Sequence, residues 1–90
     1  MIYLVRYTMV AGAADRVPQV YPRHRAYLDG FAERGEVLLI GPLLPAPGSG
    51  SLAVFRTRAA AEAFPVGDPF VLEGLAVPSE VQEWNALEFR

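Results

Sequence analysis

The only histidine of the chain, His24, lies in the segment RHRAYL. An imidazole exchanges a proton near neutral pH, so His24 is a candidate general acid or base. That chemistry requires a carboxylate to set the tautomer and basicity of the ring, and the chain has three aspartates. Asp15 is expected to cap a helix, and Asp29 lies on the helix side away from the apolar stripe. Asp68 stands at the start of an apolar turn, where a carboxylate can be partly buried.

Both His24 and Asp68 also have a purely structural interpretation. His24 lies four residues after Val20 and four before Leu28 on an apolar stripe, as a core-facing histidine with a hydrogen-bond partner would. Aspartate is a common helix N-cap, which accounts for Asp68 without any chemistry. Spacing alone therefore does not pair the two residues.

Other side chains are weaker candidates for a site. Arg6 interrupts an apolar segment and could bind a substrate anion, although an ion pair at a sheet edge explains it equally well. Tyr27, Tyr7 and Trp84 could line a pocket, although aromatic residues at such spacing are also typical of a plain core. No good nucleophile is evident. With one histidine and no cysteine, we expect no metal, haem or other cofactor.

Composition limits the classes of protein to consider. A chain of 90 residues predicts one domain, 1–90, and 52% hydrophobic residues are more than a small lone domain buries, which predicts self-association. The net charge of −2 and the scattered arginines argue against nucleic-acid binding. No segment approaches the roughly 20 apolar residues of a membrane span. The opening MIYLVRYTMV is typical of a strand rather than a signal peptide, so we expect a cytoplasmic protein.

Hydrophobic periodicity predicts strands over 2–9, 36–44, 51–57 and 77–84, helices over 16–34 and 58–64, and a helical turn over 68–75. Pro22 is expected to delay the regular part of the first helix until near Tyr21, and Pro65 to end the second. Asp68 is expected to be the N-cap of the turn, and Gly74 to follow its end.

The order β-α-β-β-α-β predicts an α+β, ferredoxin-like fold with a four-stranded antiparallel sheet and two helices on one face. A sheet face open to water would require alternating apolar and polar residues. The segment 36–44 is apolar at both alternating sets of positions. We therefore expect a homodimer that packs through the sheet faces.

The segments RHRAYLDGFAERGEVLLIGPL, GS and DPFVLEGL, followed by a strand that ends in tryptophan, resemble the YCII (YciI-like) family over nearly the whole chain. The resemblance implies a dimeric α+β barrel. It also implies that His24 and Asp68 form a catalytic pair in a pocket and that Ser51 contributes a hydrogen-bonding group. Glu73 and Pro65 depart from the family pattern and could reshape the mouth of that pocket.

Two functions from different classes remain open. The first is a cofactor-independent enzyme in which His24 and Asp68 perform acid–base chemistry of the lyase, dehydrohalogenase or isomerase type on a small organic substrate. The alternative is a non-catalytic ligand-binding or regulatory dimer. A purely structural dimerisation unit, in which His24 is a satisfied core group, is a third interpretation.

Overall fold

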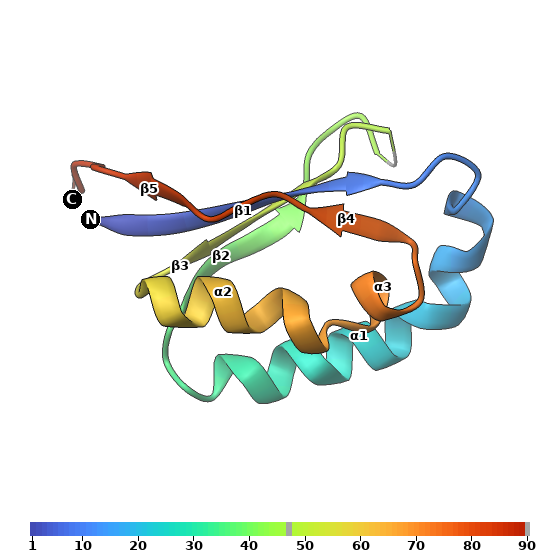
Figure 1. Ribbon diagram of the computed structural model, residues 1–90, viewed down its shortest axis with the longest axis horizontal. Helices are drawn as coiled ribbons and strands as arrows, with labels where there is room; N and C mark the ends of the chain where they lie inside the picture. Colours follow the sequence, from blue (N-terminus) through green and yellow to red (C-terminus); the bar gives the residue numbers. More distant parts are fainter. Residues whose placement is uncertain (47, 90) are drawn as a thin grey trace.

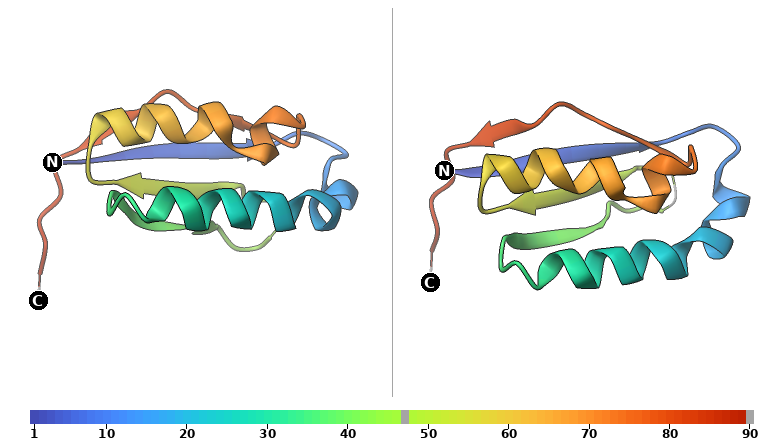
Figure 2. Two further views of the ribbon diagram at one scale, coloured as in Figure 1. Left: turned by 90° about the horizontal axis from the view of Figure 1, so that it is seen from below. Right: turned by 60° about the horizontal axis from the view of Figure 1, so that its bottom comes forward.

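The chain folds into a single antiparallel sheet with its helices on one face (Figures 1 and 2). The structure is a computed structural model that describes residues 1–46 and 48–89. The elements in order are β1 (Ile2–Met9), the 3-10 turn η1 (Ala14–Arg16), α1 (Val17–Ala32), β2 (Val37–Pro42), β3 (Ser51–Phe55), α2 (Arg58–Gly67), α3 (Pro69–Leu72), β4 (Ala76–Pro78) and β5 (Gln82–Trp84). This confirms the predicted α+β class.

The sheet has the order β2-β3-β1-β4, and β5 also pairs with β1. The single closing strand predicted over 77–84 is wrong in this detail, because β4 pairs with the end of β1 and β5 with its beginning. Between them, Ser79 bonds to Arg6: its backbone N–H donates to the Arg6 carbonyl at 2.8 Å, and its hydroxyl accepts from the Arg6 N–H at 2.9 Å. The described sheet therefore has five strands rather than the predicted four.

Both helices continue through a proline, contrary to the sequence prediction. α1 begins at Val17 rather than near Tyr21 and contains Pro22, while α2 contains Pro65 and runs to Gly67. A proline inside a helix removes one backbone hydrogen bond, and tertiary packing can outweigh that loss. On α2 the packing comes from the fully buried Phe64, next to the proline.

The start of α1 also differs from the prediction. Asp15 lies within η1, and the N-cap residue of α1 is Arg16, without a side-chain cap hydrogen bond. One helix end follows expectation: Gly74 has a φ of 73°, the left-handed conformation in which glycine commonly ends a helix. Gly35, after α1, has a φ of 76° and ends that helix in the same way.

The core lies between the sheet and the helices. Val5, Ala53 and Phe55 of the central strands are fully buried against Phe31 of α1 and Phe64 of α2. The Phe31 and Phe64 rings meet edge to face, with centroids 5.1 Å apart. Burial of these side chains and their aromatic geometry fix the helices on the sheet.

The other face of the sheet carries exposed apolar side chains. The strand register places Leu4 beside Val54, Leu39 beside Val54 and Thr8 beside Val77, on the side away from the helices. Leu39 is 69% exposed and Val77 is 57% exposed. Within the described residues no helix is long and apolar enough to cross a membrane.

Candidate active site

His24 and Asp68 meet although 44 residues separate them in the chain. His24 lies on α1, and its Nδ1 is 2.7 Å from Oδ1 of Asp68. The two side chains are 12% and 1% exposed. The imidazole stacks on the ring of Phe70, with centroids 4.0 Å apart and planes 9° from parallel. Contacts on two sides therefore fix the orientation of the imidazole.

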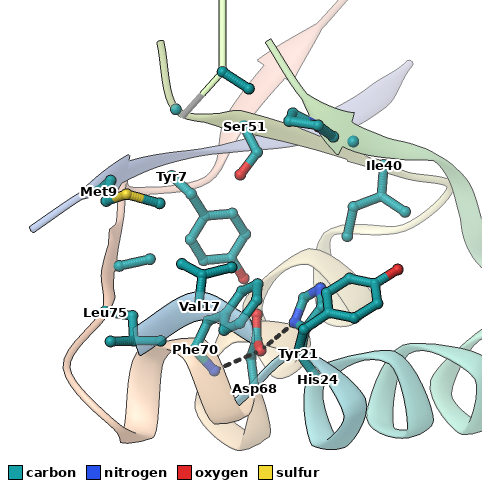
Figure 3. Close-up of a pocket in the computed structure, with 15 residues that line it drawn as sticks. Tyr7, Met9, Val17, Tyr21, His24, Ile40, Ser51, Asp68, Phe70 and Leu75 are labelled. Atoms are coloured by element: carbon teal, nitrogen blue, oxygen red, sulfur yellow. Dashed lines mark hydrogen bonds and ion pairs between the residues drawn. The ribbon is translucent and has the colours of Figure 1, made fainter. Parts of the chain in front are cut away.

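Asp68 occupies the junction between two helices. It is the C-cap residue of α2 and the N-cap residue of α3, where its Oδ1 accepts a hydrogen bond from the Phe70 N–H at 3.0 Å. The sequence offered capping and pairing with His24 as alternatives, and the same oxygen makes both contacts (Figure 3). The helix cap thus holds the carboxylate in place for the imidazole.

These contacts determine the tautomer of His24. An ionised carboxylate only accepts hydrogen bonds, so the proton of a neutral imidazole next to Asp68 belongs on Nδ1. Nε2 is then unprotonated and able to accept a proton. It makes no hydrogen bond within residues 1–46 and 48–89, and Figure 3 shows it turned away from Asp68. A free basic nitrogen held by a buried carboxylate is the arrangement of a general base.

The His24 side chain borders a cavity of about 300 Å³ between the sheet and the start of α1. Most of the lining is apolar, and the polar side chains in it are few. The lining residues are Tyr7, Met9, Val17, Tyr21, His24, Ile40, Gly41, Pro42, Ala46, Gly50, Ser51, Asp68, Phe70, Leu75 and Ala76. A mostly apolar hollow with a few convergent polar groups is typical of a small-molecule site.

Ser51 enters the cavity from the first residue of β3, and its hydroxyl points into the space above His24 and Asp68 (Figure 3). The preceding Gly50 makes this approach possible. Its φ is 76°, and a side chain there would collide with the carbonyl oxygen of Tyr7 on the neighbouring strand. Only glycine fits this position, which brings the loop close to β1 beside Ser51.

Tyr7 extends from β1 toward Asp68 (Figure 3). Burial, and then the charge of Asp68, raise the pKa of the Tyr7 phenol far above its usual range. The hydroxyl is close enough to feel that charge, but it makes no well-formed hydrogen bond within the described residues. The phenol therefore remains protonated and available as a donor.

Two of the predicted site residues lie outside the cavity. Arg6 is exposed and points to the face of the sheet away from the helices, because side chains alternate along β1 and Tyr7 points inward. Tyr27 donates a hydrogen bond from its hydroxyl to the Phe64 carbonyl at 2.8 Å and packs on Gly67. Tyr27 thus ties α1 to the end of α2, just before Asp68.

The charged residues near α3 also lie outside the cavity lining. Glu73, which the sequence suggested could reshape the pocket mouth, pairs with Arg23 at 3.4 Å, and its carbonyl accepts from Arg16 at 3.1 Å. These contacts hold α3 against the start of α1. In the described part of the chain no group of three or more histidine, aspartate or glutamate side chains could hold a metal ion.

Sequence reasoning did not single out Phe70, and it gave Tyr7 only as a weaker candidate for lining a pocket. Strand alternation contains a signal for Tyr7, since it lies on the same face as Val5, toward the helices. The only local feature that marks Phe70 is its position two residues after Asp68, where its N–H donates to the capping carboxylate. Its stacking on His24 depends on the packing of α3 against α1, which no spacing rule encodes.

Comparison with known proteins identifies the family and a shared fold. The YCII-related domain matches residues 1–85. Among solved structures, 5-chloro-2-hydroxyhydroquinone dehydrochlorinase (TftG) from Burkholderia phenoliruptrix AC1100, in complex with 2,5-dihydroxybenzoquinone, is similar with a TM-score of 0.74 and 23% identity, covering 94% of each chain. No curated protein matches. The similarity shows that the two proteins share a fold, and the domain match shows that the chain belongs to the YCII family.

Proposed function

We propose that the protein is a cofactor-independent enzyme with His24 as the general base. It would catalyse either an elimination or an isomerisation by proton transfer on a small ring compound. The observation that carries the proposal is the 2.7 Å contact between His24 and Asp68 at the edge of an apolar cavity. His24 would touch the substrate. Asp68 would act as a positioning residue, because it holds the imidazole with Nε2 free.

In the elimination reaction, the chlorinated hydroxyhydroquinone reacts as its keto tautomer, in which the carbon that carries chlorine also carries a hydrogen and is tetrahedral. Nε2 of His24 removes the proton of the hydroxyl para to the new carbonyl. The electron pair of that O–H bond forms a second carbonyl, the adjacent ring double bond shifts to the chlorine-bearing carbon, and chloride departs with the electrons of its bond to carbon. The resulting imidazolium donates hydrogen bonds through both nitrogens, and the Asp68 carboxylate stabilises its charge. In an isomerisation the same proton returns to another carbon.

The substrate class is the finer part of the proposal. A solved structure with the same fold carries the name of a dehydrochlorinase and holds a dihydroxybenzoquinone. A cavity of about 300 Å³ with apolar walls suits a single substituted ring. We therefore infer that chlorinated hydroxyhydroquinones and related hydroxylated rings are the first compounds to test.

The test is chloride release from 5-chloro-2-hydroxyhydroquinone. We expect His24→Gln to lower kcat by about 10²- to 10⁴-fold, the usual contribution of a positioned base, while the fold persists. Arg25→Gln is the surface control, because Arg25 lies one residue along α1, outside the cavity lining, and pairs with the exposed Asp29 at 2.9 Å. Full activity in His24→Gln, or none in the wild type with this or related rings, would contradict the proposal.

The role of Asp68 has a separate readout. Because His24 is the only histidine, its two ¹⁵N resonances are assigned without variants. We expect the proton of the neutral ring on Nδ1 in the wild type and a mixed population of tautomers in Asp68→Asn, with a lower kcat. A wild-type ring protonated on Nε2 would remove the free base from the cavity.

We also propose that the protein is a homodimer that packs through the open sheet face. The exposed side chains Leu39 and Val77, both on the face away from the helices, support this assembly. Exposed apolar area of this kind is typical of an interface. Leu39→Glu is expected to give a monomer in light scattering, whereas a wild-type monomer would contradict the assembly.

The alternative is a ligand-binding or regulatory dimer without turnover. The same cavity would hold its ligand. The two functions separate in one comparison: a binding module would bind ring compounds and lose affinity in His24→Gln, but would release no product in any variant.

A further inference from the structure

The buried Tyr7 hydroxyl lacks a partner of its own. The residue is 5% exposed, and residues 1–46 and 48–89 supply its hydroxyl with no hydrogen bond. Buried hydroxyl groups are nearly always paired, since an unpaired one lowers stability. Tyr7 lines the cavity, and the phenol extends into the space bordered by Ser51 and Asp68 (Figure 3). The contents of the cavity are therefore the natural source of a partner.

Electrostatics fix the kind of partner that Tyr7 can take. Burial and the neighbouring charge of Asp68 raise the pKa of the phenol, so the hydroxyl keeps its proton. The Asp68 oxygen that contacts His24 is already shared with the Phe70 N–H. The Asp68 carboxylate is also a neighbouring acceptor for the phenol, although no pair of atoms between the two described side chains meets hydrogen-bond geometry. A ligand oxygen in the cavity can therefore receive the hydrogen bond of the protonated phenol.

The charge of the lining restricts the ligand further. Among the residues that the structure describes, no arginine lines the cavity and Asp68 is the carboxylate that does. The chain contains no lysine. The walls around it include Met9, Ile40 and Leu75. A carboxylate or phosphate placed there would lose its hydration and meet a like charge, which is unfavourable in a low dielectric.

We propose that Tyr7 determines the specificity of the cavity: its hydroxyl donates a hydrogen bond to an oxygen of an uncharged, oxygen-bearing ring compound, and carboxylated analogues are excluded. The inference rests on the proposed function in one respect, namely that this ring is also the substrate of His24. Tyr7 and His24 both adjoin Asp68, so one ring can contact both. Tyr7 would then hold the oxygen while His24 takes the proton.

The experiment measures binding rather than turnover, by ¹H–¹⁵N NMR titration at pH 7 under nitrogen. The probes are hydroquinone, which is neutral; 2,5-dihydroxybenzoate, which adds a carboxylate to the same ring; and toluene, which lacks oxygen. The variants are Tyr7→Phe and Tyr27→Phe. Tyr27→Phe is the matched control because it removes a hydroxyl that bonds to Phe64 outside the cavity lining.

We expect the wild type to bind hydroquinone at least tenfold more tightly than 2,5-dihydroxybenzoate, with the strongest shifts at the cavity residues. Tyr7→Phe should weaken hydroquinone binding by roughly three- to tenfold, the usual range for one neutral hydrogen bond. The same variant should leave toluene binding unchanged, and Tyr27→Phe should bind hydroquinone like the wild type.

Three results would overturn the inference: equal binding of hydroquinone by Tyr7→Phe and wild type, equal or tighter binding of the carboxylate, or no saturable binding of hydroquinone. Its failure is distinguishable from failure of the enzyme proposal. Selective binding without turnover would keep the role of Tyr7 and reject the enzyme. Chloride release that depends on His24, with hydroquinone binding indifferent to Tyr7→Phe, would do the opposite.

Discussion

The two ends of the space between helices and sheet are built in opposite ways. At one end, Phe31, Phe55 and Phe64 fill the space with rings whose centroids lie 5.1–6.2 Å apart, and all three are at most 5% exposed. At the other end, near α3, the same layers enclose a cavity of about 300 Å³ bordered by His24 and Asp68.

The difference shows how one layer arrangement serves two purposes. The aromatic end buries apolar area and makes no demand for hydrogen bonds, so it contributes to stability through packing. At the cavity end, side chains lose packing contacts across the empty space. This end also buries the Asp68 carboxylate, and a buried carboxylate lowers stability unless hydrogen-bond partners are in place. The two ends should therefore differ in the size and kind of their response to substitution.

The largest effect is expected at the aromatic end. Phe64→Ala should lower the free energy of unfolding by about 3–5 kcal/mol, because Phe64 is fully buried among other rings. Urea denaturation followed by circular dichroism measures this loss. A loss below about 1 kcal/mol would show that the ring cluster does not anchor the helices.

Asp68 should respond differently to two substitutions. Asp68→Ala leaves His24 and the Phe70 N–H without their acceptor and should cost about 2–4 kcal/mol in unfolding free energy. Asp68→Asn keeps an acceptor oxygen for both donors, so its cost should stay within about 1 kcal/mol. Both values come from the same denaturation assay. Equal losses in the two variants would mean that the charge, rather than the acceptor, stabilises this junction.

Alkaline pH should destabilise the fold at the cavity end. The folded-state pKa of Tyr7 is raised, so above about pH 10 the unfolded chain releases a proton that the folded chain retains. Stability should therefore fall as pH rises, by up to about 1.4 kcal/mol per pH unit for this group. Tyr27, whose pKa burial also raises, adds to the same direction. Tyr7→Phe should flatten the decline between about pH 10 and 11, measured by denaturation at each pH; an unchanged slope would contradict the burial of an ionisable phenol.

The smallest effect is expected on the outer surface of α2. Arg58 and Glu62 form an exposed pair with N and O atoms 3.7 Å apart. Glu62→Gln should change the unfolding free energy by less than about 0.5 kcal/mol, since water and salt screen such pairs. Denaturation at low and high salt tests this prediction. A loss of unfolding free energy above about 1 kcal/mol would show that this exposed pair stabilises the fold more than screened surface pairs usually do.

Much of the architecture follows from local patterns. Strand-forming residue composition located β1 and β3, an aspartate before proline indicated the N-cap at Asp68, and glycine at positive φ follows α1 and α3. The errors arose where tertiary packing overrides local preference. Pro22 and Pro65 read as helix breaks, yet both lie inside helices. The closing strand divided in two because β1 supplies partners on both halves of its edge.

The site was harder to predict because its contacts are distant in sequence. His24 was a candidate because it is the only histidine of the chain. The choice of Asp68 as its partner came from the family resemblance rather than from spacing. Tyr27 and Tyr7 looked equivalent as aromatic residues, and only the packing shows Tyr7 in the cavity lining and Tyr27 bonded to the end of α2. Arg6 was a wrong candidate for a ligand contact. Side chains alternate along β1, so with Val5 and Tyr7 buried toward the helices, Arg6 points to the opposite face of the sheet.

Asp68 is both the C-cap residue of α2 and the N-cap residue of α3, so no linker residue separates the two helices. Adding or deleting one residue there would rotate the carboxylate by about 100° relative to α1, since each helical residue turns the chain by that angle. For anyone who redesigns this scaffold, the segment around 68 is a fixed frame. Ala46 lines the same cavity from a loop rather than from a junction of two helices, so a change of chain length beside Ala46 would not turn a helix.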